Sequence, residues 1–400
     1  MTPKGVVIVF PWEHWDSHPT MHQLGQELLR SFGRLLIISP DGFKVIPREE
    51  AAENPPAARK AGKLRGLGIL AWQRLPATGL RGRMVRWGAW LFRPFVRRRY
   101  AAVLGVDPLG LVFAAELGRA WNLPLAYASF EILFRNELSA RWEEQLKQAE
   151  LDASDLVRLA LVQDPLRGKI LCEENNLTAD RLVFVPVAPL PVAVGRRNLL
   201  REKLGLPSSQ RILLMAGSLD AFCSRDLLVS MADLLPENFQ LVIHARSTSG
   251  ARRGLFLDQL ARHPRISISL DFLPLENLHE LYASADFALV SYSPNPEGWT
   301  TYQNIFNIGS ASGKAAYAAM CGLPLVTSNL PTYREVFETY RCGAAYETLQ
   351  DIPKILATLD AGYAHHAGEA RRYYDEQLDP RAGLRNFRTA LVKVCGLGDE

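Results

Sequence analysis

The side chains with the clearest chemical potential lie between residues 304 and 328. Ser310 and Ser312 stand just before a run of small residues, where a short hydroxyl can cap the start of a helix. Gly313 lets the backbone approach a ligand closely, and Lys314 places a cation in the first turn of that helix. Free N–H groups, the positive end of the helix dipole and a lysine together predict an anion site, most naturally for phosphate. The alternative is an ordinary helix of an α/β domain, with Lys314 in solvent.

Two common nucleotide-binding motifs are excluded by spacing. A Walker loop has four residues between its first glycine and the Gly-Lys pair, which is followed by Ser or Thr. Here three residues separate Gly309 from Gly313, and Ala315 follows Lys314. The nearest approach to a dinucleotide-binding fingerprint is segment 66–71, which follows no strand pattern and lies in a basic region.

Apolar segments predict two successive series of strands that alternate with helices. The first series has strands at residues 5–10, 34–39, 101–105, 125–127, 159–162 and 182–185, and helices at 18–32, 109–121 and 137–149. The second has strands near 211–216, 240–244, 266–269, 287–291, 324–327 and 343–346. This alternation is typical of parallel, doubly wound sheets. The proline-rich stretch 186–191 is expected to be a stiff linker, and the residues from Arg371 onward an amphipathic helical tail.

Three features of the second half resemble the donor domain of GT-B glycosyltransferases, especially the retaining family 4. They are the segment LYASADFALV at 281–290, the helix that ends in Gly322-Leu-Pro324, and Glu335 with the Cys342-Gly343 pair. The resemblance is specific over residues 205–360 and looser before them. It implies an α/β fold of two Rossmann-like, doubly wound parallel-sheet domains facing a cleft. The implied division is an acceptor domain at 1–186 with a basic aromatic insertion at 54–106, a nucleotide-sugar donor domain at 187–370, and a helical tail at 371–400 that crosses back to the first domain.

The sequence departs from this family at two positions. The family usually carries two glutamates, eight residues apart, and the second holds ribose hydroxyls of the donor. Gly309 and Tyr317 occupy these positions here. The Tyr317 phenol can hydrogen-bond the donor or simply pack, and packing is the favoured interpretation.

Ligands of α/β sheets bind beyond the carboxyl ends of the strands, which singles out further residues of the second half. Arg225, His244 and Arg246 follow its first two strands, and the resemblance places the nucleotide base near Phe272 and Leu273. The long polar loop before the anion site is typical of functional loops. The complete predicted donor set is Arg225, His244, Arg246, Phe272, Leu273, Tyr302, Asn304, Asn307, Gly309, Ser310, Ser312, Gly313, Lys314 and Tyr317.

Polar residues also follow strands of the first half, where an acceptor would enter. Trp12, Glu13, His14, Asp16 and His18 come after the first strand. A neutral His18 imidazole can donate to or accept from a hydroxyl, although a histidine near a helix start is often structural.

Glu131 follows the strand at 125–127 and can orient a hydroxyl. His18 and Glu131 are therefore the predicted catalytic residues. No histidine–carboxylate cluster has metal-ligand spacing, so we expect neither a metal nor another cofactor.

The composition is that of an ordinary globular protein, with 48% hydrophobic and 22% charged residues. No apolar run approaches the ~20 residues of a membrane span, and segment 4–10 is expected to be a core strand rather than a signal peptide. Five scattered cysteines, an odd number, favour a reducing cytosol.

A strongly basic block is hidden within the net charge of +4. Between Asn54 and Val106 there are twelve Lys or Arg residues and no Asp or Glu, interleaved with tryptophan and phenylalanine. This composition favours a surface that lies on anionic lipid. Nucleic acid would also be attracted, but no nucleic-acid-binding motif accompanies the block, and a solvated loop with core aromatics is a further alternative. The predicted membrane-surface residues are Arg83, Arg86, Trp87, Trp90, Arg97, Arg98 and Arg99.

The sequence as a whole favours a metal-independent glycosyltransferase that moves a sugar from a nucleoside diphosphate sugar to an acceptor hydroxyl. The resemblance implies retention of configuration. The basic block suggests a lipid-linked acceptor, as in envelope polysaccharide assembly, and a cytoplasmic protein on the inner face of the cell membrane. A nucleotide-sugar epimerase of the same fold, and a catalytically weak sugar-nucleotide-binding partner of a membrane complex, remain as alternatives.

Overall fold

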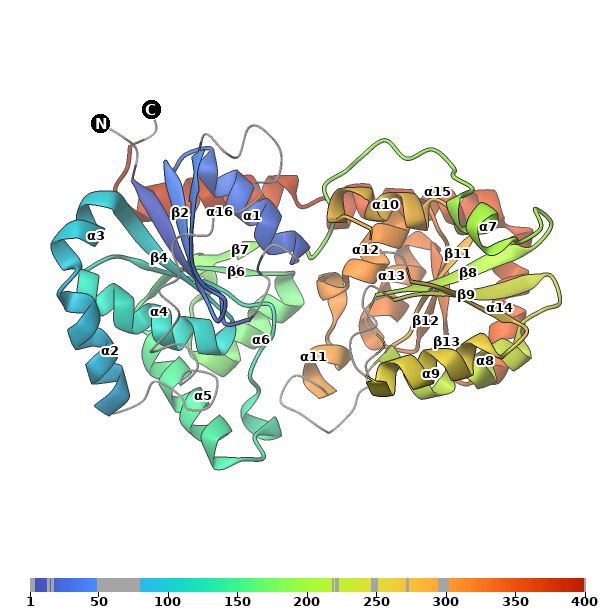
Figure 1. Ribbon diagram of the computed structural model, residues 1–400, viewed down its shortest axis with the longest axis horizontal. Helices are drawn as coiled ribbons and strands as arrows, with labels where there is room; N and C mark the ends of the chain where they lie inside the picture. Colours follow the sequence, from blue (N-terminus) through green and yellow to red (C-terminus); the bar gives the residue numbers. More distant parts are fainter. Residues whose placement is uncertain are drawn as a thin grey trace. The chain divides into compact units, whose positions relative to one another are not determined.

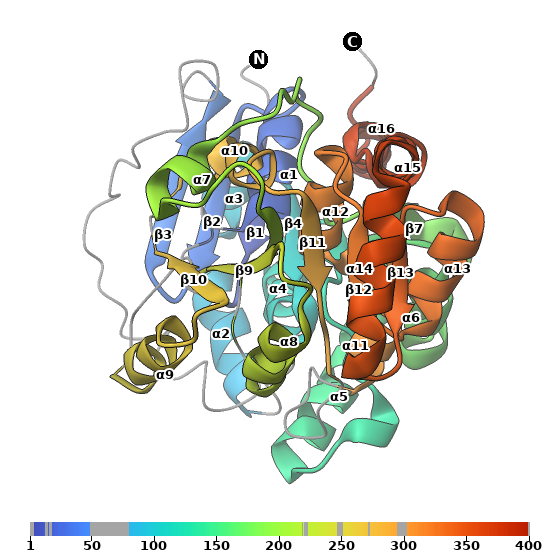
Figure 2. The ribbon, with the colours of Figure 1, turned by 90° about the vertical axis from the view of Figure 1, so that its right-hand side faces the viewer.

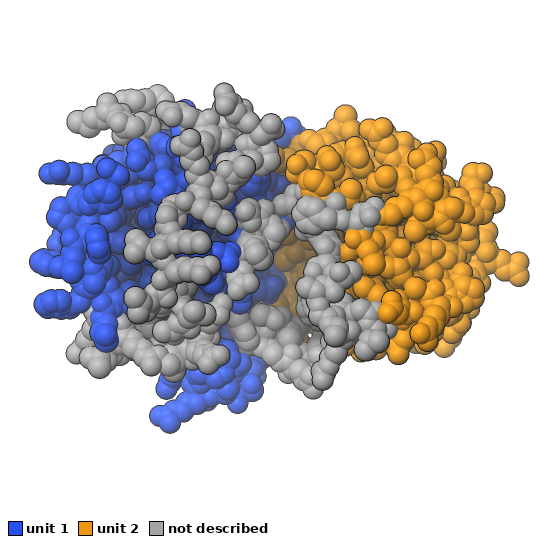
Figure 3. Space-filling model, in the orientation of Figure 1, with its two compact units in different colours: residues 1–186, 380–400 blue, residues 187–379 orange. Residues whose placement is uncertain are grey.

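The structure is a computed structural model that describes residues 4–12, 15, 18–48, 80–217, 219, 223–245, 251–270, 273–293 and 302–398, with side chains left out at 80–83, 251–255 and 275. The chain divides into two compact units (Figure 3). Unit 1 is Met1–Pro186 together with Pro380–Glu400, and unit 2 is Val187–Asp379.

Unit 1 is built on a sheet in the order β3-β2-β1-β4-β5-β6-β7. The pairings are parallel except for the β2–β3 hairpin. The hairpin strand β3 was not predicted, because its half-exposed pattern and short length give a weak apolar signal. The strands are β1 (Gly5–Val9), β2 (Arg34–Ser39), β3 (Gly42–Pro47), β4 (Tyr100–Val106), β5 (Leu125–Ala128), β6 (Val157–Val162) and β7 (Leu182–Phe184).

Helices cover both faces of this sheet. Figure 1 shows α4 (Asp107–Trp121) and α5 (Arg141–Ser154) on one face and α1 (Pro19–Leu29) and α16 (Arg381–Val394) on the other. Helices α1, α4 and α6 (Pro165–Asn175) each have a proline in the first turn, where the missing N–H costs no hydrogen bond. These starts place the residues that precede each proline at the carboxyl edge of the sheet.

The basic block contributes to the core of unit 1 as well as to its surface. Within the described residues it forms α2 (Leu80–Trp90), α3 (Arg93–Arg99) and then β4. Strand β4 is buried throughout and lies between β1 and β5. The predicted insertion therefore runs into a central strand, and its residues 54–79 lie outside the described part of the chain.

The last helix of the chain completes unit 1. Leu384, Phe387 and Leu391 of α16 are buried. At Gly383 a Cβ would lie 2.2 Å from the carbonyl oxygen of Phe184, so the helix can approach β7 this closely only with glycine at that position. The Nη1 of Arg388 lies 3.3 Å from an Oε1 of Glu27 on α1.

Unit 2 is built on a second sheet, in the order β10-β9-β8-β11-β12-β13. Its pairings are all parallel. The strands are β8 (Arg211–Ala216), β9 (Phe239–His244), β10 (Ile266–Ser269), β11 (Phe287–Val290), β12 (Leu325–Ser328) and β13 (Gly343–Tyr346). Together with the sheet of unit 1, this confirms the predicted α/β class with two doubly wound, largely parallel sheets.

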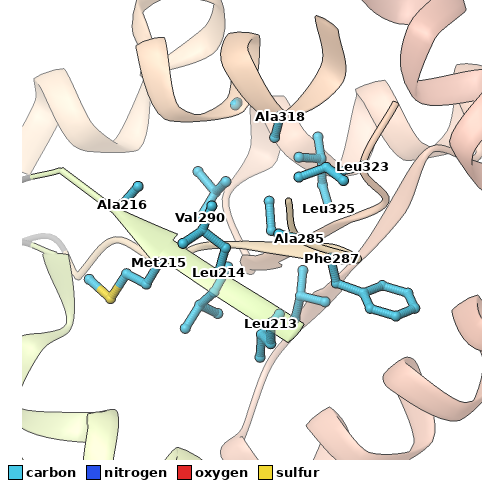
Figure 4. Close-up of a cluster of buried hydrophobic side chains, with 14 of the residues drawn as sticks. Leu213, Leu214, Met215, Ala216, Ala285, Phe287, Val290, Ala318, Leu323 and Leu325 are labelled. Carbon is cyan, nitrogen blue, oxygen red and sulfur yellow. The ribbon is translucent and has the colours of Figure 1, made fainter. Parts of the chain in front are cut away.

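Helices again cover the two faces of the sheet in unit 2. Figures 1 and 2 show α10 (Leu278–Tyr282), α12 (Gly313–Met320) and α15 (Tyr363–Tyr373) on one face, and α8 (Leu228–Leu234) and α9 (Ala251–Ala261) on the other. The remaining elements are α7 (Leu199–Leu204), α11 (Tyr302–Phe306), α13 (Pro331–Tyr340), α14 (Ile352–Ala361) and a π-helical turn at Tyr374–Leu378. Figure 4 shows Ala318 of α12 above apolar side chains of β8 and β11. This packing fixes α12 over the strands.

The buried carboxylate of Asp286 connects β8, β11 and the segment before β8 in unit 2. Asp286, immediately before β11, accepts a hydrogen bond of 2.8 Å from the backbone N–H of Ile212. Its carboxylate also pairs with the guanidinium groups of Arg196 and Arg201. A buried carboxylate is stable only when it is paired and hydrogen-bonded in this way.

Candidate functional site

Lys314 points back toward the carboxyl ends of the strands of unit 2. Its Nζ lies 3.1 Å from the Sγ of Cys223 and 5.3 Å from the ring centroid of Tyr292. At Gly217, which follows β8 with φ 111°, a Cβ would lie 3.1 Å from the Cε of Lys314. The cation therefore stands beside the ends of β8 and β11, where parallel sheets bind their ligands.

Ser312 caps the helix that carries Lys314. Its Oγ accepts a 3.3 Å hydrogen bond from the backbone N–H of Ala315, and it shares a hydrogen bond of 2.8 Å with the hydroxyl of Tyr292. Burial raises the pKa of Tyr292 well above its usual value, so the phenol keeps its proton. The start of α12 is thus fixed against the loop that follows β11.

A second hydroxyl contact joins two loops of the same edge. The Oγ of Ser224, a residue with φ 52°, lies 2.8 Å from the Oγ of Ser293. The positive end of α12, the Lys314 ammonium and these hydroxyls form one polar edge. Such an edge can hold a phosphate or diphosphate group.

Several predicted donor residues are buried within unit 2. His244 ends β9, and its Nδ1 lies 3.1 Å from the Oγ of Ser269. Tyr317 is buried and stacks on Tyr282, with ring centroids 5.4 Å apart and an interplanar angle of 14°. Asn304 of α11 is buried. Burial and stacking hold Tyr317 in the interior of unit 2, and its role toward the donor stays a prediction.

Two other predicted donor residues, Arg225 and Tyr302, lie at the surface of unit 2. Arg225 pairs with Asp226 at 3.3 Å, and its guanidinium carbon lies 5.5 Å from the ring centroid of Phe256. Tyr302 is exposed and stacks on the ring of Phe306. The donor role of Arg225 stays a prediction.

The remaining predicted donor residues border the start of α12 or lie further away. Gly309 has φ 44°, and the carbonyl of Ser310 accepts a hydrogen bond of 2.9 Å from the N–H of Val187. A Cβ at Gly313 would make only an ordinary 3.6 Å contact with Val187. The side-chain amide of Asn307 donates back to the carbonyl of Gln303, and Leu273 packs on the core. Arg246 and Phe272 lie outside the described residues.

A second polar group is centred on Asp107 in unit 1. This residue follows β4, precedes Pro108, and has φ 54°, a conformation that aspartate tolerates better than most side chains. Its Oδ1 accepts hydrogen bonds from the backbone N–H groups of Phe130 (2.8 Å) and Glu131 (3.0 Å). Its Oδ2 accepts a 3.2 Å bond from the indole N–H of Trp12. Burial raises the pKa of Asp107 to about 6, although these hydrogen bonds oppose the shift.

Arg167 and Gln163 hold the same loop from the other side. The fully buried Arg167 donates from Nη2 to the carbonyl of Phe130 at 2.7 Å and from Nε to Oε1 of Gln163 at 2.6 Å. Gln163 in turn donates to the carbonyl of Ser129 at 2.6 Å. Backbone groups of three consecutive residues, 129–131, are therefore bound by side chains from the ends of β4 and β6.

The two predicted catalytic residues lie at this edge. Burial raises the pKa of the half-buried Glu131 carboxyl to about 7, while Arg167 lowers it and Asp107 raises it further. The ring of His18 lies 5.0 Å from the ring of Phe130. Burial lowers the pKa of His18 to about 4, and its Nδ1 accepts a 3.4 Å bond from the N–H of Met21, so His18 also caps α1.

Sequence reasoning missed Asp107, Gln163 and Arg167. Trp12 joins the group, whereas Glu13, His14 and Asp16 lie outside the described residues. Their positions in the sequence could have identified them, because Asp107-Pro108 and Gln163-Asp164-Pro165 each lie where a buried strand ends and a helix begins. A polar residue at that junction lies at the ligand-binding edge of the sheet.

The predicted membrane-surface residues lie on α2 and α3 of unit 1. Arg86 forms a bidentate pair with Glu116 of α4, at 2.7 and 3.0 Å, and this pair holds α2 against α4 (Figure 1). Trp87 and Trp90 are exposed, as are Arg97, Arg98 and Arg99. The side chain of Arg83 lies outside the description.

The described ranges contain no cluster of three or more His, Cys, Asp or Glu residues that could hold a metal ion. Within the same ranges, no helix combines the length and the hydropathy needed to cross a membrane.

No protein-family model matches the sequence, and no curated protein sequence gives a significant match. Solved structures do resemble it. Sucrose-phosphate synthase from Thermosynechococcus elongatus aligns with a TM-score of 0.69 and 14% identity over 99% of this chain and 100% of that chain. HepE from Anabaena, in complex with UDP and glucose, aligns with a TM-score of 0.65 and 13% identity over 98% of this chain and 100% of that chain. WaaG, a glycosyltransferase involved in lipopolysaccharide biosynthesis, aligns with a TM-score of 0.59 and 15% identity over 98% of this chain and 100% of that chain. The two units of this chain thus have the GT-B fold that the sequence motifs implied.

Proposed function

We propose that the protein is a glycosyltransferase that moves a sugar from a nucleoside diphosphate sugar to an acceptor hydroxyl. The observation that carries the proposal is the position of Lys314, in the first turn of α12 and beside the ends of β8 and β11. A cation fixed at a helix N-terminus stabilises the charge that develops on a leaving diphosphate. The similarity to HepE, which was solved with UDP and glucose, supports a nucleotide-sugar donor.

The acceptor is proposed to bind at the edge of unit 1 that holds His18 and Glu131. A neutral His18 and a half-ionised Glu131 can both exchange hydrogen bonds with a hydroxyl near neutral pH. Retention of configuration is part of the proposal and is supported by the motif resemblance over residues 205–360. Neutralisation of the diphosphate is assigned to Lys314 and the helix dipole rather than to a metal.

The test is to incubate the protein, in EDTA, with a panel of UDP- and GDP-sugars and to follow slow donor hydrolysis. Hydrolysis of one donor, abolished in Lys314→Ala, supports the proposal. Conversion of the donor to its C2 epimer instead identifies an epimerase, and binding without turnover identifies a sugar-nucleotide-binding partner. Failure of every donor to bind overturns the proposal.

The acceptor is further proposed to be lipid-linked, as in envelope polysaccharide assembly, with α2 and α3 resting on the inner face of the cell membrane. Met84 and Trp87 lie on one face of α2, and Leu91 directly follows the helix. Their exposed fractions are 67%, 76% and 66%. The adjoining Phe92 and Phe95 are also exposed, and the guanidinium of Arg99 lies 4.1 Å from the ring centroid of Phe95.

An outward apolar stripe beside exposed arginines suits the boundary between lipid headgroups and acyl chains. The stripe lies away from the inner side of α2, where the carbonyl of Ala89 accepts a 2.8 Å bond from the indole of Trp121. The exposed aromatics of α2 are therefore free of the contacts that hold the helix to unit 1.

A further inference from the structure

We propose that Asp107 and Arg167 are positioning residues that hold Glu131 as the group which binds the acceptor hydroxyl. This inference rests on the proposed function. It assigns a role to two buried residues of unit 1 that the donor site of unit 2 does not use.

Buried side chains hold the loop at residues 129–131 by its backbone. The carboxylate of Asp107 accepts hydrogen bonds from the N–H groups of Phe130 and Glu131. Arg167 donates to the carbonyl of Phe130, and Gln163 donates to the carbonyl of Ser129. Four backbone groups in three consecutive residues are therefore bound by buried side chains. Such contacts fix where the next side chain, that of Glu131, can reach.

Asp107 itself has an uncommon backbone conformation. A residue before proline disfavours helical φ and ψ, and a non-glycine residue with φ of 54° is uncommon. Strained backbone of this kind persists only where surrounding contacts enforce it, and it is concentrated at functional sites. Here the enforcing contacts are the hydrogen bonds to Glu131, Phe130 and Trp12.

Glu131 differs in burial from the two residues that hold its loop. Asp107 and Arg167 are buried, whereas Glu131 keeps partial contact with solvent. Within the described part of the chain, the Glu131 carboxylate takes no hydrogen bond or ion pair. The held backbone therefore presents an available carboxylate at the ligand-binding edge.

The charges that face Glu131 act on it in opposite directions. Arg167, on α6, favours the ionised carboxylate, and Asp107, after β4, opposes it. His18, before α1, touches the neighbouring Phe130 ring and is neutral above its pKa of about 4. Removing the charge of Asp107 should therefore lower the pKa of Glu131, and removing that of Arg167 should raise it.

The experiment measures the ionisation of Glu131 directly. Protein labelled with 13C at glutamate carboxyls is titrated by NMR, and Glu131→Gln identifies the Glu131 signal. Asp107→Asn, which keeps one acceptor oxygen and tolerates the backbone conformation, should lower this pKa by about one unit. Arg167→Gln should raise it by about as much. Asp152→Asn, on the exposed side of α5, is the control and should leave it unchanged.

Hydrogen-exchange rates of the Phe130 and Glu131 backbone amides measure how firmly Asp107 fixes this loop. Asp107→Asn should keep both amides protected. Asp107→Gly removes the acceptor without adding backbone strain, and it should speed their exchange at least about tenfold. Shifts of the Glu131 pKa in the same direction in both charge variants, or unchanged exchange in Asp107→Gly, would overturn the positioning role.

Hydrolysis of UDP-glucose, with water in place of the acceptor, links this role to turnover. The acid limb of kcat/KM should move with the titrated pKa of Glu131, down in Asp107→Asn and up in Arg167→Gln. If the acid limb of the kcat/KM profile stays in place in both variants, the assignment of Glu131 is overturned while the proposed function stands. If no UDP- or GDP-sugar binds at all, the proposed function fails, whereas the titration and exchange results still decide whether Asp107 and Arg167 control Glu131.

Discussion

The Nζ of Lys314 lies 3.1 Å from the Sγ of Cys223, although the two residues are 91 positions apart in the sequence. This contact joins the first turn of α12 to the loop after β8. It keeps the lysine at the ends of the strands rather than in solvent, and it leads to a direct test of the anion site.

Replacing Lys314 with Ala should weaken the binding of nucleoside diphosphates by about 1.5–3 kcal/mol, the range of a charge-assisted hydrogen bond. Calorimetry with UDP and GDP measures this loss. Lys354→Ala, an exposed lysine on α14, is the matched control. Equal affinity in folded wild-type and Lys314→Ala protein would remove Lys314 from the site.

Replacing Tyr317 with Phe should leave donor affinity within a few tenths of a kcal/mol. The ring stacks on Tyr282 in the core, and Phe keeps that stacking. The same calorimetric titration checks this result. A tenfold loss of affinity, about 1.4 kcal/mol, would show that the phenol of Tyr317 binds the donor.

The unfolding free energy should carry a contribution from Glu131 that declines as the pH rises. Because burial raises its pKa from 4.5 to about 7, the folded state binds the proton more tightly than the unfolded state. Stability from this group is therefore full below pH 4.5 and is lost as the pH rises toward 7.

Urea unfolding of wild type and Glu131→Gln at pH 5 and pH 8 isolates this contribution, since other groups cancel in the comparison. The wild type should lose more stability between these pH values than the variant does. His18 acts in the opposite sense, because its lowered pKa makes stability fall as the pH drops from 6.5 toward 4. An identical pH dependence in the two proteins would refute the raised pKa of Glu131.

Replacing Asp286 with Ala should destabilise unit 2 by about 3–5 kcal/mol, because it leaves the largely buried Arg201 without its carboxylate. The donor site should survive wherever the variant folds, since Asp286 lies at the start of β11 and Lys314 beside its end. Denaturant unfolding and UDP calorimetry give the two readings. A stable variant that fails to bind UDP would assign Asp286 to the site instead.

Anionic vesicles should bind the full chain through α2 and α3. At about 1 kcal/mol per cation near a charged membrane, Arg97, Arg98 and Arg99 together give weak, salt-sensitive attachment, which exposed Trp87 and Leu91 strengthen. Flotation with phosphatidylglycerol-rich and neutral vesicles measures it.

Trp87→Ser combined with Leu91→Ser should reduce recovery, and Trp142→Ser, an exposed tryptophan on α5, should not. Equal recovery from both vesicle types, or binding unaffected by salt, would make the stripe a structural feature and the acceptor soluble.

Sequence patterns located the parallel strands because buried strands are continuous apolar runs, as in β4 and β8. They also located Lys314, since a capped helix start after a glycine-serine loop has a local signature. Asp286 lies in the segment that resembles the donor domain of GT-B glycosyltransferases, and its contacts lie in the core.

The group around Asp107 could not be predicted in the same way. Its members come from the ends of β1, β4, β5 and β6, and only the order of the strands in the sheet brings them together.

The placement of α16 has a consequence for how this chain is made. A ribosome synthesises all of unit 2 before it reaches Leu384, Phe387 and Leu391, the residues that cover β6 and β7 of unit 1. Domains generally fold in order from the N-terminus during synthesis, but unit 1 can be completed here only after the last helix has been made. The faces of β6 and β7 that α16 covers are therefore expected to stay uncovered while residues 187–379 are synthesised, so the nascent chain exposes more apolar surface than the finished protein.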